Sequence, residues 1–283
     1  MRRTLLRSIR RAAKEAIDTA GALTSRARTD PDFIIIGAQK AGTTSLYRYL
    51  CSHPRIKSAR RKEIHYFDWN YGRGRAWYRG HFPWSWGSTV GRGREWLTGE
   101  ASPYYLHHPL VPGRVAHDLP GAKLIVLLRN PVDRAFSHYQ HERVRGHEPL
   151  SFEDAIAAEA DRLATEFGRL STDPSYRSRN DERHSYLARG VYADQLTRWW
   201  SEIHRDRFII LRTEDLAGDP RATLNRVLGF LGLEAVDRAR FPRFLEGRYG
   251  AAMEPRTRAR LVEYFHPHNE RLETLLGTRQ DWD

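Results

Sequence analysis

The sequence predicts an α/β fold: a P-loop-type parallel sheet with helices on both faces, formed by a single domain with insertions. Several short runs are almost entirely apolar, such as "FIIIG" at 33–37 and "KLIVLL" at 123–128. Runs of this kind are typical of parallel strands that are covered on both sides. Stretches with helical spacing separate the runs, as expected for helices that join parallel strands. At 283 residues the chain is long enough for one large domain with a substantial core.

The expected elements alternate along the chain. They are 32–37 (strand), 43–54 (helix), 95–100 (strand), 123–128 (strand), 129–144 (helix), 190–203 (helix), 207–216 (strand and its exit) and 219–233 (helix). The first helix is expected to stop at His53-Pro54, because proline disfavours helical backbone in the residue before it. Pro131 and Pro220 suit the first turns of the helices that they open.

Two segments do not follow this alternation and are interpreted as insertions. Residues 69–96 hold many aromatic side chains among glycines and arginines, and residues 145–185 are polar and charged. Ligand sites of open α/β sheets lie beyond the carboxyl ends of the strands, where such insertions form walls. The two segments are therefore candidates for walls that bind an acceptor molecule. Ordinary core packing is the alternative for the individual aromatic residues.

The chain is strongly basic, with a formal charge of +12 and a pI near 10.1. It is therefore expected to bind an anion: nucleic acid, acidic lipid, or a small molecule with phosphate or sulfate groups. Residues 1–30 are expected to form a basic N-terminal arm, with the main domain at 31–283. Leu5, Ile9 and Ile17 are spaced loosely as in a helix, so the arm is either a peripheral helix on an anionic membrane or a solvated tail.

The location of the protein is inferred from what the sequence lacks. No apolar run is long enough for a signal peptide or a membrane span. Cys51 is the single cysteine, which excludes an internal disulfide, and no Cys or His cluster has the spacing of zinc ligands. We therefore expect a cytoplasmic protein that needs no metal, with membrane contact through the arm as an open alternative.

The segment "GAQKAGTTSL" (37–46) follows the first strand like a phosphate-binding loop. Gly37 and Gly42 have the spacing of G-x-x-x-x-G-K-[ST], but Thr43 replaces the lysine, and Lys40 lies inside the loop instead. The hydroxyl-bearing residues that follow are Thr43, Thr44 and Ser45. Backbone N–H groups at the start of the next helix suit an anion, whatever the side chains are. The loop therefore still fits a phosphate.

The strand predicted at 123–128 argues against a nucleoside triphosphate as the ligand. Its metal ion would need an acid at the end of a neighbouring strand, whereas "KLIVLL" ends in Arg129. Arg129 and Ser137, two turns into the following helix, suit a second anionic group of the ligand instead. 3′-Phosphoadenosine 5′-phosphosulfate meets both conditions, with its 5′-phosphosulfate in the loop and its 3′-phosphate at Arg129 and Ser137. Its sulfuryl group carries less charge than a phosphoryl group, so a metal is less necessary.

Taken together, these segments resemble the sulfotransferase superfamily, especially its heparan sulfate N- and 3-O-sulfotransferase branch. The resemblance covers residues 32–283 and rests on "GAQKAGTTSL", "RRKEIHYFD", "RNPVDRAFSHYQH", "EGRYG" and "LVEYFHPHNERLETLLGTRQDWD". It implies that the donor is bound by Lys40, Ala41, Gly42, Thr43, Thr44, Ser45, Arg129, Ser137, Gly247 and Arg248. Glu246 stands where the family's late Lys-Gly-Arg turn has its lysine.

The segment "KEIHYFD" (62–68) supplies candidates for the base that takes a proton from the attacking hydroxyl or amine. If this segment is extended, Glu63 and His65 lie on one face. The resemblance implies Glu63 as the catalytic base, while other sulfotransferases use a histidine, so His65 stays the alternative. Lys40 is expected to steady the departing phosphate oxygen during an in-line displacement.

The resemblance thus implies an enzyme that sulfates a hydroxyl or amine of a carbohydrate or a glycosylated acceptor. Two other functions stay open from the sequence: a P-loop kinase of a small molecule and a non-catalytic nucleic-acid-binding protein. The displaced lysine and Arg129 argue against the kinase. A nucleic-acid-binding protein has no need for the loop, Arg129 and Glu63 together, so no nucleic-acid partner is expected.

Overall fold

The computed structural model describes residues 2–85, 95–237, 240–242 and 252–282, with the helical backbone alone for residues 2–11. Its centre is a five-stranded sheet in the order β2-β3-β1-β4-β5. Every neighbouring pair of strands is parallel. The strands are β1 (Phe33–Gly37), β2 (Ile56–Ser58), β3 (Leu97–Ala101), β4 (Lys123–Leu128) and β5 (Phe208–Arg212).

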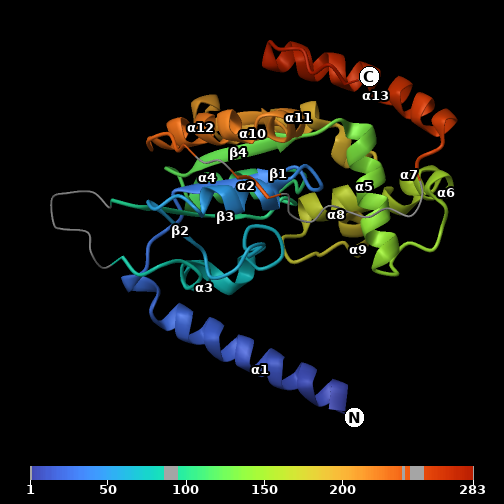
Figure 1. The fold of residues 1–283 in the computed structure, drawn as a ribbon. Coiled ribbons are helices and arrows are strands. Elements are labelled where there is room, and N and C mark those ends of the chain that lie inside the picture. The colour runs from blue at the N-terminus through green and yellow to red at the C-terminus, as the bar shows by residue number, and fades with distance from the viewer. Residues whose placement is uncertain (1, 86–94, 238–239, 243–251, 283) are drawn as a thin grey trace.

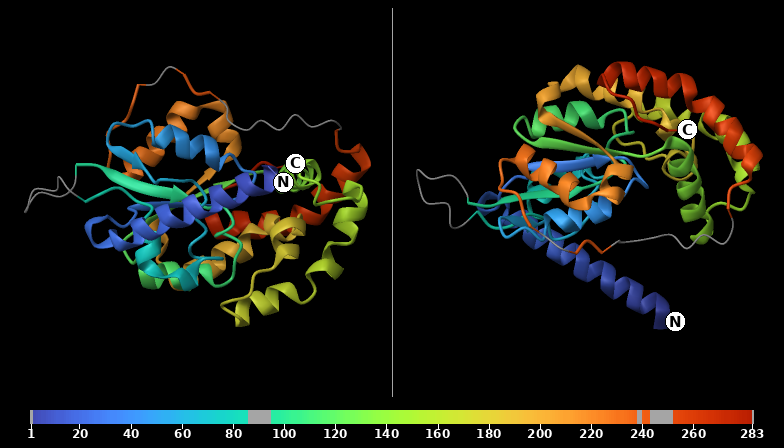
Figure 2. Two further views of the ribbon diagram at one scale, coloured as in Figure 1. Left: turned by 90° about the horizontal axis from the view of Figure 1, so that it is seen from below. Right: turned by 45° about the horizontal axis from the view of Figure 1, so that its top comes forward.

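Helices cover both faces of this sheet (Figure 1). The helices are α1 (Arg2–Leu23), α2 (Thr43–Leu50), α3 (Gly74–Arg79), α4 (Val111–Asp118), α5 (Pro131–Val144), α6 (Phe152–Ala157), α7 (Glu159–Leu163), α8 (Glu166–Thr172), α9 (Arg179–His184), α10 (Tyr192–Glu202), α11 (Thr213–Gly218), α12 (Pro220–Leu231) and α13 (Pro255–Leu276). α2 and α12 contact each other on one face, and α4 and α10 contact each other on the other (Figure 2). The predicted fold class, one α/β domain around a parallel sheet, is confirmed.

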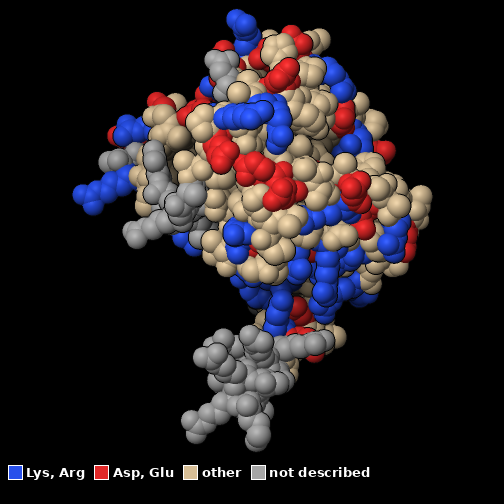
Figure 3. Space-filling view, turned by 90° about the vertical axis from the view of Figure 1, so that its right-hand side faces the viewer, with Lys and Arg blue, Asp and Glu red and all other residues tan. Residues whose placement is uncertain are grey.

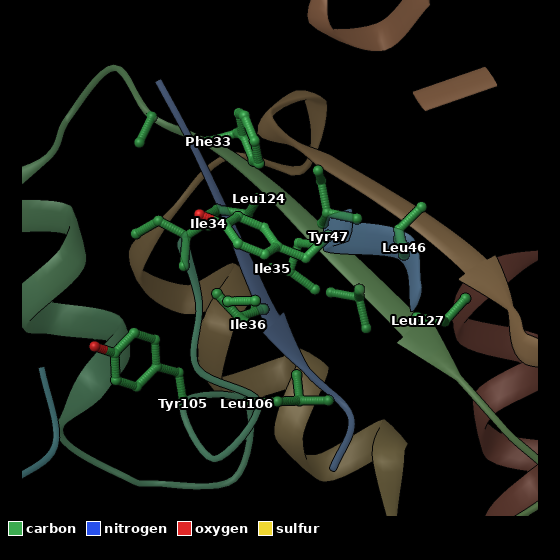
Figure 4. Packing of buried hydrophobic residues seen from close by; sticks show 14 of the residues in the cluster. Phe33, Ile34, Ile35, Ile36, Leu46, Tyr47, Tyr105, Leu106, Leu124 and Leu127 are labelled. Atoms are coloured by element: carbon green, nitrogen blue, oxygen red, sulfur yellow. The ribbon is translucent and has the colours of Figure 1, made fainter. Parts of the chain in front are cut away.

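The core forms around β1, whose residues are buried along the whole strand. Figure 4 shows the β1 side chains packed between those of α2, such as Leu46 and Tyr47, and Leu106 of the segment after β3. β4 lies beside β1 and is buried from Leu124 to Leu128. Strands that are apolar on both sides thus occupy the centre of the sheet, as their sequence indicates.

Several element boundaries differ from the sequence-based prediction. α2 ends at Leu50, before the expected stop at Pro54. β2, α4 and α13 have no counterpart among the predicted elements. In the aromatic insertion, Trp77, Tyr78 and Phe82 are buried in the core, so packing explains them.

The C-terminal part of α1 is docked on α3. Asp18 is only 3% exposed, accepts a hydrogen bond from Arg60 and lies 3.6 Å from Nε2 of His81. The backbones of Gly21 and Gly80 touch, because a Cβ on Gly80 would lie 2.5 Å from the Gly21 carbonyl carbon. This part of the basic arm is therefore attached to the domain, while the boundary between residues 30 and 31 stays a prediction.

Candidate active site

The loop between β1 and α2 turns at two residues with positive φ angles. Lys40 has φ 71° and Gly42 has φ 88°; glycine adopts this region without steric cost, whereas lysine does not. The N–H of Ala41 donates to the Ala38 carbonyl oxygen at 3.2 Å and closes the turn. α2 begins directly afterwards at Thr43. The N–H groups of its first turn have no carbonyl partner within the helix, which is the arrangement that binds anions.

A cavity of about 1000 Å³ adjoins this loop. Most residues that the sequence indicated line it: Lys40, Gly42, Thr43, Thr44, Ser45, Glu63, His65, Arg129 and Ser137. Ala41, which is part of the loop, is fully buried. Gly247 and Arg248 lie outside the described residues, so their contact with a donor stays a prediction. The structure thus brings the loop, the end of β4 and the segment 62–68 together around one space.

The side chain of Arg129 contacts the backbone of Lys40. Nη1 of Arg129 donates to the Lys40 carbonyl oxygen at 3.0 Å, and the Arg129 carbonyl oxygen accepts from the Tyr192 hydroxyl at 2.9 Å. Burial, together with the charges of Arg129 and Arg145, lowers the pKa of Lys40 from 10.5 to about 8. An ammonium group in such surroundings is stabilised by any anion that binds next to it.

α5 carries Ser137 from the exit of β4 to the cavity. Asn130 caps the helix, with its Oδ1 accepting from the Val132 N–H at 2.9 Å. Ser137 is followed at helical spacing by His141 and Arg145, which line the same cavity. The sequence analysis missed these two residues, although the spacing of four residues from Ser137 would have indicated them.

Glu63, His65 and Asp68 form a series of contacts at the cavity wall. Nδ1 of His65 lies 2.7 Å from Oδ2 of the buried Asp68, and Nε2 lies 4.0 Å from Oε2 of Glu63. Oε1 of Glu63 accepts from Nζ of Lys62 at 2.5 Å. Asp68 therefore fixes the imidazole in an orientation that directs its other nitrogen toward Glu63.

The charges in this series perturb both titrating groups. Burial opposes the charged form of Glu63, but Lys62 and His65 outweigh it and lower the Glu63 pKa below 4.5. Burial also disfavours charge on His65, yet Asp68 outweighs it and raises the His65 pKa above 6.5. Near neutral pH, Glu63 is therefore an ionised carboxylate beside an imidazole that retains its proton more readily than an ordinary histidine.

The segment is not extended, so Glu63 and His65 do not meet by strand alternation. Both residues have left-handed backbone, with φ 59° and 55°. Such angles cost free energy of order 1–3 kcal/mol each and persist only where the surroundings enforce them. The N–H of Glu63 donates to the Ala101 carbonyl oxygen at 3.0 Å, and the N–H of His65 donates to Oγ of Ser102 at 3.3 Å. The end of β3 thus holds both residues in place.

A buried carboxylate supports this attachment. Glu100 is fully buried and accepts hydrogen bonds from the hydroxyls of Tyr78 (2.8 Å), Ser102 (2.7 Å) and Tyr105 (3.2 Å). The Tyr105 oxygen in turn accepts from the Tyr66 N–H at 2.7 Å. The sequence analysis missed this function of "GEASPYY", although an acid followed by hydroxyl-bearing residues at a strand end is the signal that a buried network leaves.

Tyr105→Phe is expected to lower the free energy of unfolding by about 1–3 kcal/mol, because it leaves the buried Tyr66 N–H without its acceptor. Urea denaturation measures this difference. Tyr264→Phe is the matched control, since Tyr264 is 42% exposed and its ring contacts survive the change. Equal stability of the two variants would show that the Tyr105 hydroxyl does not hold the segment.

Both insertions contribute to the cavity wall, with Trp69 from the first and Arg177 from the second. Trp69 stacks on His65 with ring centroids 3.7 Å apart, and the Arg177 guanidinium lies 3.8 Å from the centroid of the Trp69 ring. Nε of Arg177 donates to Oε1 of Glu182 at 2.5 Å. His65 and Arg177 thus cover the two faces of the Trp69 indole, and the edge of the ring is left for contact with a ligand.

Positive charge dominates the cavity lining. The lysines and arginines there are Lys40, Lys62, Arg129, Arg145, Arg177, Arg183 and Arg189. The carboxylates there are Glu63, Glu142 and Glu182. Within the described ranges, no group of His, Cys, Asp and Glu side chains is arranged to hold a metal ion. The cavity is therefore suited to polyanionic ligands that are neutralised by side chains.

Comparisons with known proteins agree with this geometry. A family model described as "Sulfotransferase domain" matches residues 30–244. A solved structure of a sulfotransferase from Alicyclobacillus acidocaldarius has a TM-score of 0.71 and 31% identity, and the match covers 89% of this chain and 98% of that one. Membrane-associated sulfotransferase kil1 of Dictyostelium discoideum is 28% identical, over 97% of this chain and 71% of its own length.

A further relative is a longer protein. Bifunctional heparan sulfate N-deacetylase/N-sulfotransferase 1 of Mus musculus is 31% identical over 87% of this chain, but the match covers 29% of its own length. The chain thus spans less than a third of that relative.

Proposed function

Because this chain belongs to the sulfotransferase domain family and is an enzyme of that class, we propose that 3′-phosphoadenosine 5′-phosphosulfate is its donor. We further propose that it transfers the sulfuryl group to a hydroxyl or amine of a carbohydrate or a glycosylated acceptor. One observation carries the proposal: the anion-binding loop with Lys40, the Arg129–Ser137 pair and the carboxylate of Glu63 line a single cavity.

The donor fits this lining by its charge. Its 5′-phosphosulfate accepts hydrogen bonds from the N–H groups at the start of α2 and from Lys40, Thr43 and Thr44. Its 3′-phosphate binds to Arg129 and Ser137, since a guanidinium group and a hydroxyl donate good hydrogen bonds to phosphate oxygens. The cations of the cavity supply the neutralisation that a divalent metal supplies in kinases.

The proposed chemical step is an in-line displacement at sulfur. Glu63 accepts the proton of the acceptor hydroxyl or amine while the acceptor atom forms its bond to sulfur. The bond between sulfur and the 5′-phosphate oxygen breaks, and the electron pair stays on the phosphate, which Lys40 stabilises. His65 and Asp68 position the carboxylate. His65 itself is the alternative base, and its raised pKa leaves it in the protonated form more often than an ordinary histidine.

The acceptor is proposed from the other wall of the cavity. Trp69 offers the edge of its indole ring to a sugar, and Arg145, Arg177 and Arg183 offer charges for acidic groups on it. The heparan sulfate named in the description of the murine relative supports a sugar acceptor for this chain.

The proposed location is the cytoplasm, with peripheral contact to a membrane. Over the part of the chain that the structure describes, no helix combines the length and the apolar character needed to cross a bilayer. The description of the Dictyostelium relative as membrane-associated supports contact with a membrane surface.

Thermal unfolding with added nucleotides tests the donor. A ligand that binds only the native state raises the melting temperature, so 3′-phosphoadenosine 5′-phosphate should raise it well above the value with ATP and Mg²⁺. Sulfation of an acceptor panel should persist after chelation of divalent cations. Stabilisation by ATP–Mg²⁺ alone would favour a kinase and overturn the proposal.

The Lys40 pKa predicts an alkaline limit of activity. kcat/KM reports the free enzyme, in which Lys40 loses its proton as the pH rises through about 8. We therefore expect kcat/KM to fall above pH 8 by about tenfold per pH unit, because only the charged form stabilises the leaving phosphate. Lys40→Arg keeps the charge at all accessible pH values, so its profile should lack this limb. A limb that persists unchanged in Lys40→Arg would instead belong to another group.

A further inference from the structure

The helix α1 contacts the domain through the side that carries Asp18, Gly21 and the half-buried Ala22. Asp18 and Gly21 are buried against Arg60 and Gly80, as described for the fold. Amphipathic helices of folded domains ordinarily turn their apolar side inward. The packing of α1 is therefore reversed, and its apolar side has to face away from the domain.

The outward side of α1 is a stripe of exposed apolar residues. At about 100° per residue, they fall within an arc of about 140° that faces away from Asp18, with Ile17 at its edge: Ala12, Ala13, Ala16, Ile17, Ala20 and Leu23. Ile17 is 53% exposed and Leu23 is 82% exposed. In the sequence, Leu5 and Ile9 continue the same spacing toward the N-terminus. Within the described residues, no other element covers the exposed side of Ile17 or Leu23.

Positive charge accompanies this stripe. The basic residues of the helical segment are Arg2, Arg3, Arg7, Arg10, Arg11 and Lys14. Its acidic residues are Glu15 and Asp18, and the latter is neutralised by Arg60. Figure 3 shows further Lys and Arg side chains gathered on the lower part of the molecule, toward the end from which α1 projects.

We propose that α1 is an interfacial helix that lies in the surface of an anionic lipid bilayer and inserts the stripe between Ala12 and Leu23. A helix with an apolar side, a basic polar side and low overall hydrophobicity binds in this way. Charge complementarity selects an anionic bilayer over a second copy of this chain, because the helical segment has six basic and two acidic residues and a second copy carries the same excess of positive charge. The inference extends the proposed peripheral location and does not depend on the donor or the acceptor.

Co-sedimentation of the full chain with lipid vesicles tests the proposal. The protein should bind vesicles of phosphatidylglycerol mixed with phosphatidylcholine, should bind pure phosphatidylcholine much more weakly, and should be released by salt. Ile17→Gln combined with Leu23→Gln should lower the partition coefficient by about tenfold or more, since both apolar side chains would be lost from the bilayer. Glutamine keeps helix propensity close to that of leucine.

Val144→Gln is the matched control, because Val144 is 81% exposed on α5, away from the stripe. It should bind vesicles like the unmodified protein. The melting temperature, and its increase with 3′-phosphoadenosine 5′-phosphate in the absence of lipid, should be the same in all variants. These measurements separate a failure of membrane binding from a failure of the proposed function.

Three results would overturn the proposal. The first is equal vesicle binding by the double variant and the unmodified protein, and the second is no binding to anionic vesicles at all. The third is a dimer in solution that becomes a monomer in the double variant, since a second copy would then cover the stripe.

Discussion

Glu63→Gln is expected to lower kcat by about 10²–10⁴-fold, the range that general-base catalysis contributes. The amide keeps the size of the carboxylate but cannot accept the acceptor's proton at neutral pH. The donor affinity should stay within about twofold of the unmodified value, because the proposed donor contacts come from the loop, Arg129 and Ser137. Single-turnover kinetics and calorimetric titration with 3′-phosphoadenosine 5′-phosphate measure the two quantities separately.

Glu182→Gln is the matched control for this variant. It removes a carboxylate from the same cavity, where Glu182 pairs with Arg177 instead of His65. Its kcat should change far less than that of Glu63→Gln. A similar loss in both variants would mean that the net charge of the cavity, and not a base at residue 63, limits the rate.

Arg129→Ala is expected to weaken binding of 3′-phosphoadenosine 5′-phosphate by about ten- to a hundredfold. Hydrogen bonds to charged groups contribute about 1.5–3 kcal/mol, and each 1.4 kcal/mol is about a tenfold change in affinity. Adenosine 5′-phosphate lacks the 3′-phosphate, so its affinity should fall only slightly, through the lost hydrogen bond to the Lys40 carbonyl oxygen. Titration of both nucleotides into both proteins gives the required ratio.

Arg145→Ala removes a guanidinium group from the same cavity lining and serves as the control. It should leave the preference for the 3′-phosphate unchanged, since the proposed 3′-phosphate site is formed by Arg129 and Ser137. Equal losses for the two nucleotides in Arg129→Ala would instead show that Arg129 acts by supporting the loop.

The centre of the fold could be predicted because its strands are buried on both sides. β1 and the part of β4 after Lys123 are apolar without interruption, and the sequence places both strands within one residue of their observed bounds. β2 has three residues, of which only Ile56 is buried, so it leaves almost no periodic signal. α13 contains Pro267, which normally ends a helix.

α13 nevertheless continues through this proline. Leu261 and Phe265 before it and Leu272 after it are buried, so tertiary packing holds both halves of the helix. A proline that would end an isolated helix is tolerated here because of tertiary packing, and one sequence does not reveal such packing.

The candidate site could be predicted where one short segment carries several of its features. The loop from Gly37 to Ser45 is such a segment, and Glu63 and His65 lie in another. Arg177 was out of reach, because its importance depends on its contact with Trp69, which lies far away in the chain. The left-handed backbone at Glu63 has no sequence signal either, since glutamate does not favour it.

The docking of Asp18 has a practical consequence for truncated proteins. The family match starts at residue 30, which would make that residue the natural first residue of a shortened recombinant protein. Such a chain would leave Arg60 and His81 without the carboxylate that they face, and Gly80 without the backbone that covers it. A shortened protein that begins ahead of Asp18 keeps these contacts, which a protein cut at the start of the family match would lose.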